Sequence, residues 1–178
     1  MKKVVLTYGL IAGAVVSAFM AVSMISQKDH LENMGAGAMI IGYLGMLISF
    51  TFIFVAVKNY RDKQNGGKVS FGKAFSIGLL ISLIASAMYV ITWHFVYTYH
   101  MPNFMEGYSA KMIAEAKGTL SGARLDAEIA KINSAKEMYA TPLGFILFTL
   151  AEILPVGILV SLIVALVLKR KRPAVQVS

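Results

Sequence analysis

Four long apolar stretches, separated by polar segments, dominate this chain of 178 residues. They run over about 4–26, 36–57, 74–98 and 143–168. A helix needs about 20 mostly apolar residues to cross the hydrocarbon core of a bilayer, and each stretch reaches that length. The pattern predicts an all-α fold, an integral membrane four-helix bundle that occupies 1–178 as a single membrane domain.

The connection between the third and fourth stretches, about 103–140, is long and polar and has a periodicity of its own. Apolar residues recur at helical spacing in two runs: Met105, Tyr108, Met112 and Ile113, then Leu125, Ile129 and Ile132. We expect helices over about 104–117 and 123–139, which form a hairpin-like external loop. Each is too short to be stable alone in water, so they must pack on each other, on the membrane surface or on a partner.

Charge divides unevenly between the two ends of the predicted spans. The ends that share a side with both termini carry eleven basic residues and one acid, whereas the other side carries six basic and seven acidic residues. This asymmetry follows the positive-inside rule, so we expect both termini in the cytoplasm. The partners expected for the basic loops are anionic lipid head groups, within the lipid bilayer, and not nucleic acid.

The first apolar stretch follows Lys2 and Lys3, as the apolar region of a signal peptide would. It is longer than the 7–15 residues typical of such peptides, and no clear cleavage site follows it. We expect it to remain as the first span. The chain then has an even number of spans, which agrees with basic clusters at both termini.

Small residues recur at four-residue spacing in each predicted span. In lipid, helices associate by close backbone approach at such residues. The pattern predicts helix contacts at Gly9, Gly13, Gly42, Gly78, Ser82, Gly157 and Ser161. The alternative is that one of these faces is left for a second copy, which would make the protein a homo-oligomer.

Glu152 is the one charged residue deep inside a predicted span. A charge at the bilayer centre costs about 2.5–3.5 kcal/mol on insertion scales, so we expect its carboxyl to face the bundle interior and to be protonated, hydrogen-bonded or paired. Pro155 removes a helical hydrogen bond beside it. Glu152, Pro155, Tyr89 and His94 are the candidate intramembrane polar site. It is either a glutamate that fixes helix register or a proton or cation site.

The sequence gives little support to a metal site, a thiol nucleophile or enzymatic catalysis. The absence of cysteine excludes thiolate metal sites and a thiol nucleophile. His94 and His100 are six residues apart and do not share a helix face, so no metal site is expected. We expect no catalytic residue and no cofactor. An intramembrane enzyme would need Glu152 and His94 to share a proton, directly or through one water.

Two segments carry a resemblance to a known family. They are Val69–Leu80, with its Phe-Gly-Lys-Ala-Phe, and Glu152–Leu166, with its Leu-Pro-Val-Gly. Over nearly its whole length the chain resembles an uncharacterised family of small four-span bacterial membrane proteins, catalogued only as a domain of unknown function. The resemblance implies an inner-membrane protein of Gram-negative bacteria with a helical periplasmic loop between spans three and four. It implies no activity.

These observations favour a structural or accessory membrane protein whose external helical segment binds a membrane protein partner or mediates assembly. A small oligomeric transporter or channel that uses the carboxyl of Glu152 is the first alternative. An intramembrane enzyme is the least favoured.

Overall fold

The computed structural model describes residues 1–27 and 36–170 of the chain. The described elements are α1 (Lys2–Ser26), α2 (Ala36–Asn59), the π-helical turn η2 (Tyr60–Gln64), α3 (Phe71–His100), α4 (Phe104–Thr119), α5 (Ala123–Tyr139) and α6 (Pro142–Leu168). Some residues used in the sequence argument lie outside the described ranges: Lys28, Lys171, Arg172 and the acids of the first external connection.

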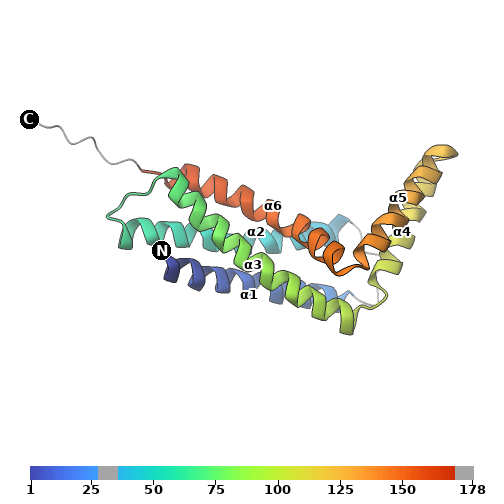
Figure 1. Ribbon diagram of the computed structural model, residues 1–178, viewed down its shortest axis with the longest axis horizontal. Helices are drawn as coiled ribbons and strands as arrows, with labels where there is room; N and C mark the ends of the chain where they lie inside the picture. The colour runs from blue at the N-terminus through green and yellow to red at the C-terminus, as the bar shows by residue number, and fades with distance from the viewer. Residues whose placement is uncertain (28–35, 171–178) are drawn as a thin grey trace, which may run out of the picture.

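Four of these helices are long and apolar enough to cross a membrane: Lys2–Ser26, Ile40–Gln64, Phe71–His100 and Pro142–Leu168. They lie side by side as a bundle, with α3 along α1 and α6, and α2 along the same two helices (Figure 1). Large apolar side chains cover the outside of the bundle; Ile48, Leu159 and Leu166 are each more than half exposed. A soluble surface rarely carries such continuous apolar cover. The predicted all-α membrane four-helix bundle is confirmed.

The ends of the spans are set by residues that cap them. The hydroxyl of Ser70 accepts a hydrogen bond from the backbone N–H of Lys73, at 3.3 Å, where α3 begins. Thr141 does the same for Gly144 at 3.0 Å, just before Pro142 opens α6. A capping oxygen satisfies a backbone donor that has no helical partner, and proline suits the first helical position.

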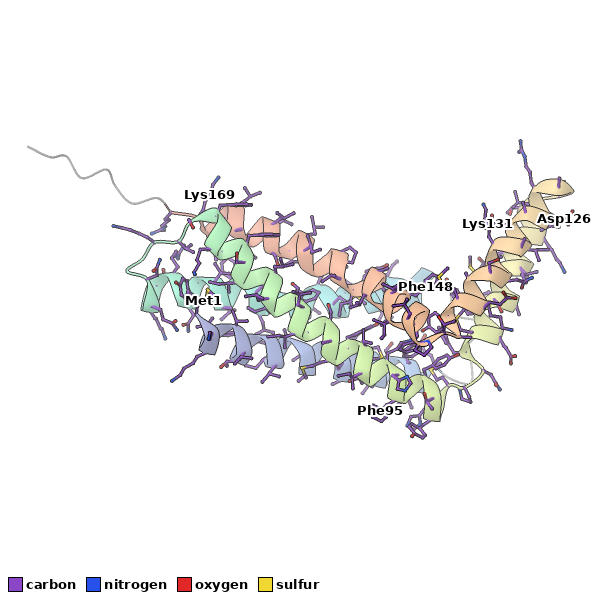
Figure 2. All side chains as sticks on the ribbon, in the orientation of Figure 1. Met1, Phe95, Asp126, Lys131, Phe148 and Lys169 are labelled. Atoms are coloured by element: carbon purple, nitrogen blue, oxygen red, sulfur yellow. The ribbon has the colours of Figure 1, made fainter. Side chains whose placement is uncertain are left out.

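We name the two ends of the bundle by what they carry. Met1 and Lys169 lie at one end, the basic end, and the other is the arm end (Figure 2). From the arm end α4 and α5 project together at an angle to the spans, as a helical hairpin that we call the arm (Figure 1). The positive φ of Gly122, 56°, occurs where the chain reverses between these helices. The predicted external helical hairpin is therefore present.

The basic-end half of the bundle is closely packed. Phe50, Ile53, Ile77 and Ile81 are 0% exposed. Small residues let α3 and α6 approach: a Cβ added at Gly78 would lie 2.7 Å from the Ser161 hydroxyl. The matching Cβ at Gly157 would lie 2.6 Å from the hydroxyl of Ser82, and the two hydroxyls are 3.4 Å apart.

The α1–α3 contact is close in the same way. A Cβ added at Gly9 would lie 3.0 Å from the side chain of Ile84, and one at Gly13 would lie 3.2 Å from the backbone of Ala85. Gly42 differs from the prediction, because a Cβ added there meets nothing within 4 Å. Gly45, one turn further along α2, is the glycine that lies against α1, on the ring of Phe19.

Candidate functional site in the arm-end half of the bundle

A small cavity lies between the four spans in the arm-end half, and we call it the polar cavity. Its volume is about 30 Å³, taken as the space open to the centres of water-sized spheres. A water needs about 10–15 Å³ on this measure, so the space suits one or two waters or an ion of similar size. Its lining comes from all four spans: Val16, Phe19, Met20, Ser23 and Met24 of α1 with its C-cap Gln27, Gly42 and Met46 of α2, Tyr89 of α3, and Glu152 of α6.

Glu152 faces the polar cavity between the spans, at the edge of the bundle core and outside its fully buried part. It is an exposed residue that lines the polar cavity, and within residues 1–27 and 36–170 its carboxyl makes no hydrogen bond or ion pair. The buried face of α6 follows Thr149, Ile153 and Gly157, four residues apart. Glu152 is one position before Ile153, which turns it about 100° from that face. The helix rotation therefore places the carboxyl at the edge of the core.

Tyr89 meets Glu152 at this cavity. The tyrosine is 4% exposed, and its hydroxyl has no hydrogen-bond partner among the described residues. It lies within electrostatic range of the Glu152 carboxyl. Because the Tyr89 hydroxyl and the Glu152 carboxyl have no hydrogen-bond partner within the described residues, this pair offers hydrogen-bonding capacity to whatever enters the cavity.

Two buried hydroxyls near the cavity, those of Ser17 and Ser86, lack partners within the described part of the chain. Each is within one helical turn of a lining residue, Met20 or Tyr89. Elsewhere in the bundle, buried hydroxyls donate to the carbonyl four residues earlier in the helix: Ser49, Ser82, Thr149 and Ser161 do so at 2.7–3.0 Å. Unpartnered polar groups therefore gather around the polar cavity.

Sequence reasoning missed the polar residues of α1 that line the cavity. The Gln27 amide donates to the carbonyl and hydroxyl oxygens of Ser23, at 3.0 and 3.1 Å. Both residues follow Val16 and Met20 on one helix face, at spacings of three and four. That spacing is the signal that could have found them.

The other two residues of the predicted polar site lie elsewhere. The ring of His94 packs edge-on against Phe145, with centroids 5.5 Å apart, and His94 is not part of the cavity lining. Pro155 is exposed and also outside the lining, and α6 continues through it as one helix. The structure thus brings together Glu152 and Tyr89, and separates them from His94 and Pro155.

An aromatic cluster joins the arm to the bundle beyond the cavity. The indole N–H of Trp93 donates to the hydroxyl of Tyr139, and the Trp93 ring meets Phe104 edge-on at 5.1 Å. Tyr139 also meets Phe145 at 5.2 Å. Burial raises the pKa of Tyr139 to about 12, partly offset by the bond from Trp93. The tyrosine is therefore neutral near pH 7.

A metal centre is not formed by the described residues, in which no three His, Asp or Glu side chains come together. A family model described as a protein of unknown function (DUF4199) matches residues 7–170. The chain belongs to this family. The match covers the four spans, the polar cavity and the arm, and it confirms the resemblance to a domain of unknown function. No curated protein and no solved structure matches the chain.

Proposed function

We propose that the protein is an accessory membrane protein, whose four spans anchor the arm and whose arm binds a protein partner outside the membrane. The observation that supports this proposal most directly is the position of the arm, which projects away from the bundle (Figure 1). Its attachment runs through its base, where α5 meets α6 and Phe104 meets Trp93.

The arm supports itself, which suits a docking element. Its two helices pack on each other, and Lys136 of α5 pairs with Glu106 of α4 at 3.7 Å. Its surface carries many charged residues; Asp126 and Lys131 mark its far part (Figure 2). Among possible partners, this surface favours one with polar and charged contacts, because most of the arm's large apolar side chains are half-buried, and only Tyr108 and Met138 among them are exposed, at 38% and 52%.

Shortening the arm tests this function. A variant that lacks residues 108–135 keeps the aromatic cluster at the arm's base. We expect crosslinking in native membranes to recover a defined partner with the wild type and not with this variant. The matched control reverses the exposed pair Lys131–Glu128, 3.2 Å apart, and so keeps the arm's length and net charge. Equal partner recovery by the shortened and full chains, with both inserted, would exclude the proposal.

The basic-end half argues against a pore through a single copy. Phe50, Ile53, Ile77 and Ile81 fill its centre at 0% exposure, and the polar cavity lies wholly in the other half. A conducting path would need this apolar region to open or to be replaced by a path between copies.

The polar cavity favours a second candidate function, the uptake of a proton or small cation at Glu152. A carboxyl in an intramembrane cavity is a functional-site hypothesis by default. Vesicles that contain the protein and a pH-sensitive dye should show proton uptake that Glu152→Gln reduces and Glu115→Gln, on the arm, leaves unchanged. Identical traces for the wild type and Glu152→Gln would exclude this function and leave the docking function intact.

A further inference from the structure

The lipid-facing surface between α2 and α6 holds a second depression, separate from the polar cavity. This α2–α6 groove has a volume of about 460 Å³, and its lining includes Leu47, Thr51, Phe54 and Val55 of α2 and Val160 and Ile163 of α6. The only polar residue in the lining, Thr51, donates its hydroxyl to the carbonyl of Ile48 at 2.6 Å. The groove therefore presents an apolar surface, which fits a hydrocarbon chain.

Both walls of the groove lead to basic residues at the basic end. Lys58 follows Phe54 by one turn on α2, and Arg170 lies two turns beyond Ile163, just past the end of α6. The backbone N–H of Arg170 donates to the carbonyl of Val69 at 2.9 Å, which fixes this residue beside the α2–α3 connection.

The two basic residues converge on one place. Lys58 and Arg170 both act electrostatically on the carboxylate of Asp62. That carboxylate is already bound by Arg61, at 2.6 Å, so one cation of the group is matched and two remain. Both Lys58 and Arg170 are exposed, and each follows the last residue of the groove lining along its chain segment, Val55 on α2 and Val164 on α6.

We propose that the α2–α6 groove, with Lys58 and Arg170, binds one anionic phospholipid. The phosphate lies at the two basic side chains, and one acyl chain lies in the groove. The dimensions agree: the eleven residue steps from Leu47 to Lys58 rise about 16 Å, close to half of the roughly 30 Å hydrocarbon thickness. This site depends on membrane insertion and on neither proposed function.

Lipid retention by the full chain tests the proposal. The protein is purified from vesicles of equal phosphatidylglycerol and phosphatidylcholine, and the lipids bound per chain are counted by native mass spectrometry. We expect one retained phosphatidylglycerol. Lys58→Gln with Arg170→Gln should reduce its retention about 25-fold, since each basic residue near a lipid surface changes affinity about five-fold.

Matched variants separate this site from general surface charge. Lys63→Gln with Lys73→Gln removes two exposed charges from the same end and should leave retention unchanged. Val160→Trp should fill the groove and displace the lipid with both charges present, whereas Leu83→Trp, on exposed α3 surface, should not. These apolar variants also test the site if the charge variant fails to fold.

Three results would overturn the proposal. Equal phosphatidylglycerol retention by the wild type and the Lys58/Arg170 variant would show that these cations do not bind it. An equal loss with the Lys63/Lys73 variant would reduce the effect to surface charge. Because the chain has no cysteine, Thr51→Cys tests for a second copy in the groove, and efficient disulfide-linked dimers would show that a protein occupies it.

Discussion

The two halves of the bundle use the same four helices in different ways. In the basic-end half, Gly78 and Gly157 bring α3 and α6 together, and the centre is filled by side chains such as Ile53 and Ile77 with no exposed surface. In the arm-end half the helices enclose the polar cavity, with Tyr89 and Glu152 on its wall. One half is suited to hold the fold, and the other has room for a ligand.

Residue size accounts for this difference. In lipid, close packing at small residues supplies much of the helix association, and two such glycines face serines in the basic-end half. The arm-end half places three methionines, Met20, Met24 and Met46, around the cavity. Methionine is flexible and adapts to irregular spaces. The arm-end half can therefore adjust its packing at lower cost than the basic-end half.

The largest expected effect is at the close-packed glycines. In Gly157→Ala the new Cβ would lie 2.6 Å from the Ser82 hydroxyl and 3.0 Å from the ring of Phe50, so the helices must shift. Overpacking of this kind costs about 1–3 kcal/mol. Unfolding in detergent micelles should show a loss of that size. The control is Gly42→Ala, which meets nothing within 4 Å and should be neutral or stabilising. Similar losses in both variants would contradict the comparison between the halves.

The next effect is at the base of the arm. Tyr139→Phe leaves the buried indole N–H of Trp93 without its acceptor, and we expect a loss of about 1 kcal/mol. Hydrogen exchange in α4 and α5 should become faster, while exchange in the basic-end half stays unchanged. Because Trp93 is the single tryptophan, its fluorescence reports directly on this contact. Unchanged exchange in the arm would show that the bond does not hold it.

Alkaline titration tests the same contact without a change at Trp93. The folded pKa of Tyr139, about 12, is above the ordinary tyrosine value of 10.0, so its contribution to stability is complete below pH 10. It should be lost as the pH rises from 10 to 12, because the unfolded chain ionises first. Tyr139→Phe should lack this part of the pH dependence, which separates it from the titration of lysines on the arm.

The sequence predicts the fold well because bilayer thickness and backbone hydrogen bonding constrain it strongly. Long apolar stretches must be helices in the bilayer. The polar connection, whose apolar residues recur at helical spacing, can form two helices that pack on each other as a hairpin. The site is less predictable, because it depends on helix rotation. A turn of about 100° decides whether Glu152 or Ile153 enters the core, and one helical turn separates Gly42, in open space, from Gly45, at a contact. The mean hydropathy of a segment does not depend on which way its helix is turned, so it cannot decide between these arrangements.

A smaller effect compares two serines of α3 on the same buried face. Ser82 donates to the carbonyl of Gly78 at 3.0 Å and lies 3.4 Å from the Ser161 hydroxyl, whereas the Ser86 hydroxyl has no partner in the described chain. Ser82→Ala should cost about 0.6 kcal/mol, the average for polar contacts between membrane helices. Ser86→Ala should cost nothing or stabilise, because it removes an unsatisfied group. A larger loss at Ser86 would mean that its hydroxyl is satisfied in the membrane, and that water reaches beyond the polar cavity.

The smallest expected effect on stability is at the residue that the sequence makes most conspicuous. Glu152 is exposed and has no partner among the described residues, so Glu152→Gln should change the unfolding free energy by less than about 0.5 kcal/mol. The same substitution should abolish labelling by an apolar carbodiimide, which reacts with protonated carboxyl groups in membranes. Labelling that persists would place the reactive carboxyl elsewhere. A stability loss as large as that of Gly157→Ala would show that Glu152 is part of the packing that holds the fold. The two halves of the bundle would then differ in polarity, but both would serve to stabilise the fold.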